Sequence, residues 1–229
     1  MSDRPGGALA KRPLQFIYVV DTSGSMMGKK MESLNLAVRE SIKPMQDVAN
    51  ENPNADVLVR VLRFSNGAQW HVSQPTSIHD FRWTDLDADG ITDMGHAMRL
   101  VAEALKVENM PMRGLPPVIL LITDGMPTDD FDGGLQALLA EPWGKRSVRI
   151  GLAIGNDADL EAIERFIANP EIKPLRADNV QDLVKKIKWA STVPLKAASS
   201  PQSAASGDKN IPIPTAPADT HAASANDIF

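Results

Sequence analysis

The chain has 229 residues and a formal net charge of −5 at pH 7, from 24 lysines and arginines against 29 aspartates and glutamates. Its hydrophobic fraction of 43% excludes disorder throughout, and the mildly acidic charge argues against nucleic acid as a partner, because nucleic-acid binders need a basic surface. The lack of cysteine excludes disulfides, cysteine-ligated metals and thiol catalysis, and fits a reducing compartment.

The N-terminal segment, residues 1–13, is polar, and no apolar core of a signal peptide follows it. We therefore expect this segment to be flexible and the protein to be cytoplasmic. The longest apolar runs, residues 16–20 and 118–122, are far shorter than the roughly 20 residues of a membrane-spanning helix, so no membrane association is expected. Both runs are instead typical of parallel strands covered by helices on both faces.

Further strands and helices follow from the spacing of apolar residues. Alternating valines over residues 57–61 predict a strand, and the Asn66-Gly67 turn predicts that residues 68–72 return antiparallel beside it at a sheet edge. Helices are predicted where apolar residues recur with a 3.6-residue period, and Pro44 should kink or end the first one near Ile42. In chain order the predicted elements are a strand at 16–20, a helix at 34–45, strands at 57–61 and 68–72, a helix at 94–105, a strand at 118–122, a helix at 135–139, a strand at 148–154, a helix at 160–167, a short strand at 173–176 and a helix at 180–187.

This alternation of strand and helix predicts an α/β fold with a doubly wound, mostly parallel open sheet, helices on both faces and one antiparallel edge strand. We expect a single domain over residues 14–190. From about residue 190 the composition changes to Ala, Ser, Pro and Thr, with hardly any residue that could anchor a core. Residues 191–229 are therefore expected to form a disordered tail.

Oxygen-bearing side chains occur in the loops after the apolar strands, where open α/β sheets bind their ligands. Asp21, Ser23 and Ser25 come directly after the first strand, and Asp124 follows the strand at 118–122. If these two strands are neighbours, both carboxylates lie in one crevice. The loop that leads into the helix at 94–105 can bring the hydroxyl of Thr92 to the same place.

Two carboxylates and three hydroxyls form an all-oxygen set of ligands, which suits a hard divalent cation. We expect Mg²⁺ or Mn²⁺, and Ca²⁺ less readily. Because three of the ligands are neutral, the bound ion would keep electrophilic character and an open or water-filled position. A carboxylate or phosphate on a partner protein could then complete its coordination shell.

Three motifs occur in a fixed order: Asp-x-Ser-x-Ser after an apolar strand, a Thr ahead of Gly-x-Ala on a helix, and Thr-Asp-Gly after another apolar strand. Together they resemble the metal-ion-dependent adhesion site of von Willebrand factor A (VWA) domains, over roughly residues 14–190. The resemblance implies a VWA, Rossmann-like fold and a non-catalytic, metal-dependent protein-binding function. It also implies the metal ligands Asp21, Ser23, Ser25, Thr92 and Asp124.

Within that family, residues 19–26, 121–130 and 153–155 are similar to the bacterial tellurium-resistance TerY-type branch. This similarity implies an intracellular module of a stress-response or defence system that works with a protein kinase and a protein phosphatase. Either enzyme is then a candidate partner. The Ser/Thr-rich tail is a candidate for phosphorylation by such a kinase.

A second cation site is an open alternative at Asp85, Asp87 and Asp89, which with Gly90 imitate the first half of an EF-hand loop. The twelfth position of that loop is His96 instead of the bidentate glutamate. The other reading is an acidic surface loop in which Gly90 turns the chain toward the adhesion-site motif.

An enzymatic alternative uses the same Asp/Ser cluster as a metal-dependent phosphoryl hydrolase. The segment that begins at Asp21 resembles the start of an aspartyl-phosphate phosphatase, but Ser23 stands where the general acid would be. A phosphate-binding loop at residues 24–30 is rejected, because its glycine spacing is one residue short and no Ser or Thr follows the lysine.

Other polar and apolar residues near the motifs have two readings each. Met26 and Met27 can contact a partner or be buried against the sheet. His96, one helical turn after Thr92, can bias the local charge or simply lie on the surface at a helix start, and the surface position is expected. Two interpretations are open for Asp129, Asp130 and Asp132. They can form a negatively charged rim beside the site, or they can lie in a solvated loop at a helix N-terminus, where the helix dipole favours aspartate.

Overall fold

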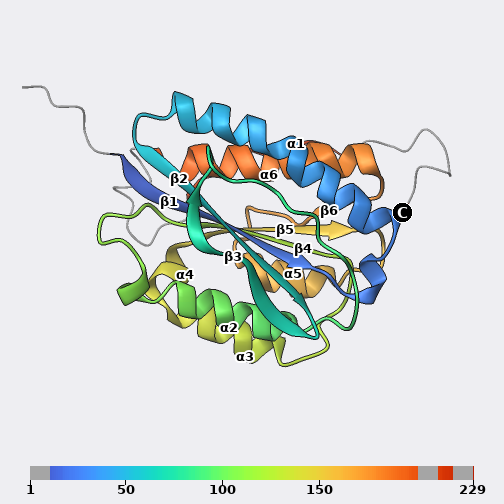
Figure 1. Cartoon of the computed structure of the whole chain (residues 1–229). Helices are drawn as coiled ribbons and strands as arrows, with labels where there is room; N and C mark the ends of the chain where they lie inside the picture. Colours follow the sequence, from blue (N-terminus) through green and yellow to red (C-terminus); the bar gives the residue numbers. More distant parts are fainter. Residues whose placement is uncertain (1–10, 201–210, 219–228) are drawn as a thin grey trace, which may run out of the picture.

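The computed structural model describes residues 11–200, 211–218 and 229, and arranges them as a sheet between two layers of helices (Figure 1). In this part of the chain the strands are β1 (Arg12–Asp21), β2 (Ala55–Ser65), β3 (Gly67–Ser77), β4 (Val118–Thr123), β5 (Val148–Ile154) and β6 (Leu175–Ala177). The helices are α1 (Lys29–Glu51), α2 (Met94–Ala104), α3 (Phe131–Ala140), α4 (Pro142–Arg146), α5 (Leu160–Ile167) and α6 (Val180–Ala198), with 3₁₀ turns η1 (Gly24–Met26) and η2 (Val107–Asn109).

The strand order in the sheet is β3-β2-β1-β4-β5-β6. All neighbouring pairs are parallel except β2 and β3, which form an antiparallel hairpin at the edge. Gly67 opens the second strand of that hairpin with a φ of +77°, a backbone conformation that favours glycine. The predicted fold class is therefore confirmed, and β1 lies beside β4 as the site prediction required.

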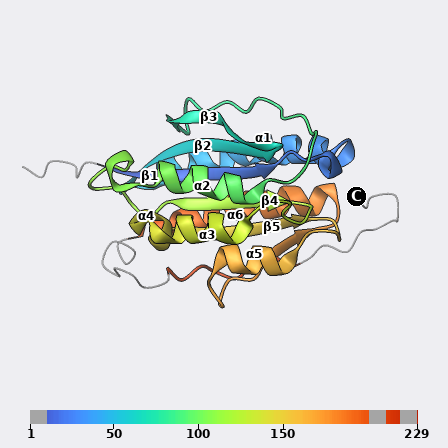
Figure 2. The same cartoon turned by 90° about the horizontal axis from the view of Figure 1, so that it is seen from below.

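Two hydrophobic cores cover the two faces of the sheet. Along β1, Phe16, Tyr18 and Val20 point into the core beneath α1 and α6, while Ile17 and Val19 point into the core beneath α2, α3 and α5. This alternation follows from the two-residue period of a strand. Figure 2 shows the molecule from below, with α2 and α3 in front of the sheet and α1 and α6 behind it.

Helix α1 continues through Pro44 to Glu51. The prediction that the helix could end near Ile42 is therefore wrong. Proline removes one backbone hydrogen bond and crowds the preceding turn, at a cost of about 3 kcal/mol. Beyond it, however, Met45, Val48 and Ala49 are buried in the core that α1 shares with α6. Burial of these side chains offsets the cost, because each large apolar side chain contributes about 1.5–3 kcal/mol.

The ordered part of the chain continues past the expected boundary at residue 190, since α6 runs to Ala198. Leu195 and Ala198 are buried, and the hydroxyl of Ser191 donates to the carbonyl of Ile187, so an Ala/Ser-rich composition is compatible with a packed helix here. Residues 211–218 return to the body of the domain. Arg12 and Pro13, the end of the segment expected to be flexible, belong instead to β1. Residues 1–10 of that segment, and residues 201–210 and 219–228 of the expected tail, lie outside the described residues.

Within residues 11–200, 211–218 and 229, no helix is both long enough and apolar enough to cross a bilayer.

Candidate metal centre

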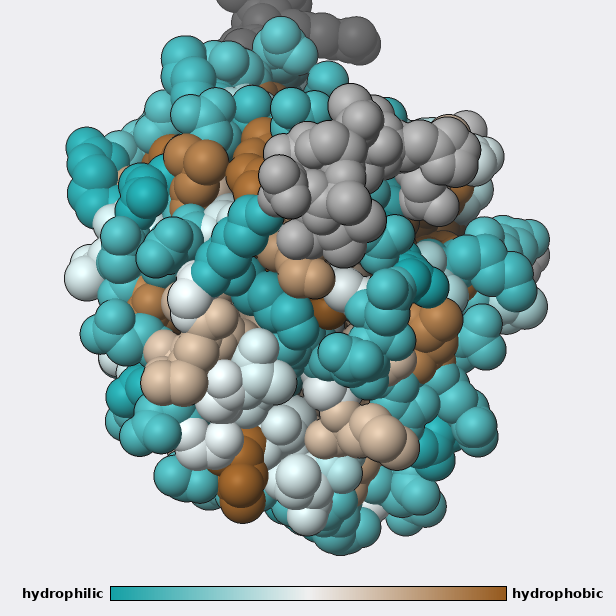
Figure 3. All heavy atoms as spheres, turned by 90° about the vertical axis from the view of Figure 1, so that its right-hand side faces the viewer, coloured by the Kyte–Doolittle hydropathy of each residue, from teal (hydrophilic) through white to brown (hydrophobic). Residues whose placement is uncertain are grey.

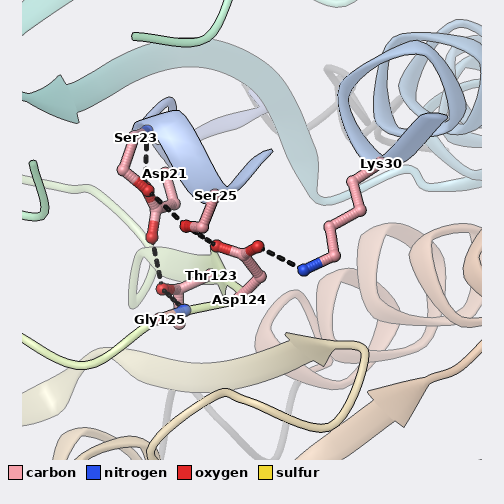
Figure 4. A network of polar contacts seen from close by, with 7 residues as sticks. All are labelled: Asp21, Ser23, Ser25, Lys30, Thr123, Asp124 and Gly125. Carbon is pink, nitrogen blue, oxygen red and sulfur yellow. Dashed lines mark hydrogen bonds and ion pairs between the residues drawn. The ribbon is translucent and has the colours of Figure 1, made fainter. Parts of the chain in front are cut away.

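The candidate site lies where β1 and β4 end side by side. Asp21 is the last residue of β1, and Asp124 follows directly after the last residue of β4. The parallel register pairs Val20 with Ile122, so the two aspartates leave the sheet at the same edge. Both side chains are fully buried. Figure 4 shows the two carboxylates close together below the η1 turn, with the side chain of Ser25 between them.

Both carboxylate oxygens of Asp21 accept hydrogen bonds from the protein. The backbone N–H of Ser23 donates to Oδ1 at 2.8 Å, and the hydroxyl of Thr123 donates to Oδ2 at 2.5 Å. Burial nevertheless raises the pKa of Asp21, and the neighbouring charge of Asp124 adds to the rise, while the bonds from Thr123 and Ser23 lower it. A positive charge close to Asp21 would therefore stabilise its ionised form.

Asp124 is the end of a chain of oxygen atoms (Figure 4). The hydroxyls of Ser23 and Ser25 lie 3.0 Å apart, and Ser25 donates to Asp124 Oδ1 at 2.6 Å. The other oxygen, Oδ2, accepts from the ammonium of Lys30 at 2.5 Å. The serines are brought here by η1, which turns the chain sharply between β1 and α1.

Thr92 reaches the same place from the loop before α2. A Cβ atom added to Gly125 would lie 3.4 Å from Thr92 Oγ1 and 3.8 Å from Ser25 Oγ, so both hydroxyls converge on this glycine. The loops are tied together by their backbones, because Thr128 N–H donates to the Thr92 carbonyl at 2.9 Å and Thr92 N–H donates to Thr128 Oγ1 at 3.1 Å.

The donor set fits a hard divalent cation. In an octahedral Mg²⁺ site, with metal–oxygen distances near 2.1 Å, adjacent ligand oxygens lie about 3 Å apart. The spacings of 3.0 Å from Ser23 to Ser25 and 2.6 Å from Ser25 to Asp124 are close to this value. The structure thus brings together Asp21, Ser23, Ser25 and Asp124 in one network, with Thr92 beside it.

Two residues of the site were missed by the sequence reasoning, Lys30 and Thr123. Lys30 was considered only within a rejected phosphate-binding loop, although it follows Gly28, whose φ of +70° turns the chain from η1 into α1. Thr123 belongs to the Thr-Asp-Gly motif, but its hydroxyl was assigned no task. The apolar run before Thr123 was the available signal, because it marks the strand end that points this hydroxyl at Asp21.

The three nearby aspartates act at helix starts and in ion pairs. Asp129 accepts from the N–H groups of Gly95 and His96 at 2.7 Å each, which caps α2. Asp130 caps α3 through Gly133 N–H and pairs with an arginine of α2. The remaining one, Asp132, pairs with an arginine of α5. The helix-terminus reading therefore accounts for them better than a free negative rim.

The acidic loop at residues 85–90 buttresses the site. Asp85 pairs with Arg39 of α1, and the backbone N–H of Asp89 donates to the Thr22 carbonyl at 2.8 Å. Gly90, with a φ of +86°, accepts from Gly24 N–H at 2.9 Å. Among the described residues, no three His, Asp or Glu side chains are grouped so that they could hold a metal ion. This arrangement favours the surface-loop reading over a calcium loop.

The two methionines after the serines divide between the two readings. Met26 is fully buried in the core beneath α1, whereas Met27 is 62% exposed. His96 is an exposed residue of α2, and its ring faces Gly67 in the β2–β3 hairpin. It therefore lies on the hairpin side of α2.

Comparisons with known proteins agree with this architecture. Residues 16–126 match the family model of the von Willebrand factor type A domain. The chain is also 30% identical over 159 residues to human inter-alpha-trypsin inhibitor heavy chain H6, and the match covers 66% of this chain and 12% of that protein.

Solved structures share the fold. A von Willebrand factor type A protein from Catenulispora acidiphila matches with a TM-score of 0.60 and 14% identity, over 80% of this chain and 43% of that one. Proximal thread matrix protein 1 from the mussel byssus, solved with a zinc-occupied MIDAS motif, matches with a TM-score of 0.58 and 14% identity, over 80% and 46%. The chain spans less than half the length of each of these relatives. Residues 16–126 thus match the von Willebrand factor type A model, and the architecture of the described residues is a von Willebrand factor type A-like fold.

Proposed function

We propose that the chain is a non-catalytic protein-binding module that works through a divalent metal ion, Mg²⁺ or Mn²⁺ in preference to Ca²⁺. The observation that carries the proposal is the buried oxygen network at the ends of β1 and β4. The proposed metal ligands are Asp21, Ser23, Ser25, Thr92 and Asp124. A carboxylate or phosphate on the partner protein would complete the coordination shell.

The chemistry of the ligand set supports binding as the task. Two carboxylates and three neutral hydroxyls leave a bound divalent ion attractive to a further anion. The mussel protein whose fold this domain shares was solved with zinc in its MIDAS motif, which supports a metal ion at this edge of the fold. The catalytic alternative lacks a general acid, because Ser23 stands where that acid would be. The Ser23 hydroxyl instead forms a hydrogen bond with the hydroxyl of Ser25.

The surface around the network supports a protein as the partner. Among the described residues, seven large apolar side chains are exposed, and four of them adjoin the site. Met27, Ile91 and Met126 flank Ser25, Thr92 and Asp124 in sequence; Leu160 follows Asp159, whose N–H donates to the Gly125 carbonyl. Figure 3, which views this edge of the sheet, shows apolar residues between hydrophilic ones. Exposed apolar side chains clustered in this way mark interaction surfaces.

A groove beside the network offers room for an extended partner segment. It has a volume of about 400 Å³ and lies between α1 and residues 85–88. Met27 and Met31 contribute apolar walls, and Arg39 and Asp85 contribute a charged one. A partner that places an anion on the metal could continue along this groove.

The direct test is thermal unfolding in EDTA, Mg²⁺, Mn²⁺ or Ca²⁺, with the wild type and Asp21→Ala. A ligand at ten times its Kd stabilises the folded state by about 1.4 kcal/mol, which raises the midpoint of a domain of this size by about 3–6 °C. We expect this rise with Mg²⁺ and Mn²⁺ in the wild type alone. A rise that persists in Asp21→Ala would mean that the metal binds outside the network. Hydrolysis of p-nitrophenyl phosphate that is lost in Asp21→Ala would favour the hydrolase alternative.

We further propose a cytoplasmic setting in a tellurium-resistance or stress-response system, with a protein kinase or phosphatase as partner. The motif similarity to the TerY-type branch is the support for this setting. The test is the affinity of the purified kinase and phosphatase of such a system for this chain, in Mg²⁺ and in EDTA. Binding of neither enzyme in Mg²⁺ would contradict the assignment.

A further inference from the structure

The ammonium of Lys30 lies in the network where a metal would be expected to supply positive charge (Figure 4). Its distance to Asp124 Oδ2 is 2.5 Å, and the side chain is only 16% exposed. Nζ also lies 3.7 Å from the position that a Cβ on Gly155 would occupy, so the ammonium fits between Asp124 and the loop after β5. Lys30 is thus held on two sides at the edge of the site.

The position of Lys30 in its helix is electrostatically unfavourable. It is the second residue of α1, where the helix macrodipole is positive and disfavours a cation. The favourable partner is the fully buried carboxylate of Asp124. The interaction that accounts for the placement of this lysine is therefore the one with the site.

The charges of the network do not balance without a further cation. Asp21 and Asp124 together carry two negative charges when ionised, and the ammonium of Lys30 compensates one of them. A divalent ion and this ammonium would act on the same carboxylate, Asp124, and two cations that share one carboxylate repel each other. The lysine and the metal therefore oppose each other at Asp124.

We propose that Lys30 is an internal cation that stabilises the metal-free site and lowers the affinity of the site for a divalent ion. The inference rests on the proposed metal-binding function and adds the regulation of that site. In the metal-free protein the ammonium neutralises Asp124. When the metal binds, this ion pair weakens, so the lysine sets the metal concentration at which the site fills.

The experiment compares the wild-type chain of 229 residues with Lys30→Met, Lys30→Gln and Lys30→Arg. The matched control is Lys43→Met, which removes an exposed charge from the same helix. Affinity for Mn²⁺ is measured by isothermal titration calorimetry, and the midpoint of thermal unfolding is measured in EDTA. Glutamine keeps a hydrogen-bond donor, so it serves as a second neutral variant if methionine impairs folding.

We expect the Kd for Mn²⁺ to fall about tenfold in Lys30→Met and Lys30→Gln, because a nearby positive charge has been removed. Lys30→Arg should stay within about twofold of the wild type because it keeps the positive charge, and Lys43→Met should do so because the charge it removes is exposed and screened. In EDTA, the midpoint of Lys30→Met should lie below that of Lys43→Met, and saturating Mn²⁺ should narrow this gap.

The outcomes separate the two proposals. If the wild type binds Mn²⁺ and the neutral variants bind it with the same or a lower affinity, the inference is overturned. The proposed function then still stands. A lower affinity would make Lys30 a residue that orients Asp124 for the metal. Absence of Mn²⁺ binding in the wild type and in both neutral variants overturns the proposed function and this inference with it.

Discussion

Tyr18 is the single tyrosine of the chain and lies fully buried in the middle of β1. Burial raises its pKa to about 12, although hydrogen bonds with Ser41 and Ser191 act in the opposite direction. We expect the ultraviolet absorbance of tyrosinate to titrate near pH 12 in the folded protein. Because no other tyrosine contributes, a midpoint near 10.0, the ordinary pKa of tyrosine, would show that Tyr18 is accessible to water.

The same shift predicts a loss of stability in alkali. The unfolded chain releases the Tyr18 proton near pH 10.0, whereas the folded protein retains it to about pH 12. The contribution is therefore complete below pH 10 and is lost as the pH rises toward 12. Tyr18→Phe should lose less unfolding free energy over this interval than the wild type, as measured by urea unfolding at fixed pH values.

The two aspartates of the site should respond oppositely to neutralisation in EDTA. The folded-state pKa of Asp21 is raised, so its contribution to stability is complete below the unfolded value near 3.8 and is lost as the pH rises through the folded value. Asp21→Asn should therefore stabilise the metal-free protein at neutral pH. Asp124→Asn removes the partner of Lys30 and should destabilise it by about 2 kcal/mol.

Thermal unfolding in EDTA measures both changes, and both variants should lose the response to Mg²⁺. Equal destabilisation by the two substitutions would contradict the charge balance drawn from the network. The hydrogen bonds of Asp21 do not forbid asparagine, because the Thr123 hydroxyl can rotate to accept a proton from the amide.

The sequence predicted the position of a site residue correctly where that residue lies at the end of a strand. Asp21 and Asp124 follow unbroken apolar runs, so their meeting required only that β1 and β4 be neighbours. Lys30 could not be predicted in the same way, because its contact depends on the rotation of α1 after the turn at Gly28. Side-chain rotation about a helix axis depends on packing, which the local sequence does not determine.

At the scale of elements, α2 and α3 approach so closely that glycine is required at their crossing. A Cβ atom on Gly134 would lie 2.3 Å from the carbonyl oxygen of Gly95, which is backbone and cannot move aside alone. Gly134→Ala gains about 1 kcal/mol of helix propensity but overpacks the crossing, which costs about 1–3 kcal/mol. We expect a net loss of stability in urea unfolding.

The substitution should also weaken metal binding, because Gly95 lies in the first turn of α2 and Thr92 lies just before that helix. A shift of α2 would move the Thr92 hydroxyl away from Gly125. The control is Gln136→Ala, an exposed position of α3 that should leave the Kd for Mn²⁺ unchanged. An unchanged Kd in Gly134→Ala would mean that Thr92 is positioned independently of the helix crossing.

Elements were predicted well where one pattern dominates and poorly where tertiary contacts decide. The strand at residues 148–154 has its predicted bounds, and every residue in it is buried. The strand predicted at 173–176 is found at Leu175–Ala177, because pairing with β5 sets its register. Pro44 predicted a helix end near Ile42, but burial against α6 outweighs the lost hydrogen bond. Local preference was overridden where burial was larger.

At the scale of the molecule, the two faces of the sheet have different roles. The loops that precede α2 and α3 build the site together with η1 at the ends of β1 and β4, while α1 and α6 form a continuous layer over the opposite face from α2 and α3 (Figure 1). Residues 211–218 extend that layer beside β6, where Ile213 packs against the core. A hollow of about 240 Å³ remains there, lined by Trp189, Ile213 and Pro214 among others.

Because this segment packs through partly buried apolar side chains, it should detach when one of them becomes charged. Ile213→Asp is expected to lower the midpoint of thermal unfolding by about 2–4 °C, from the loss of about 1 kcal/mol of burial. It should also shift the fluorescence of Trp189 to the red, as water reaches the indole, and Trp189→Phe assigns that change among the four tryptophans. Pro212→Asp adds the same charge at an exposed position and is the matched control. Equal effects of the two substitutions would mean that residues 211–218 do not contribute to the core, and the domain would then end with α6.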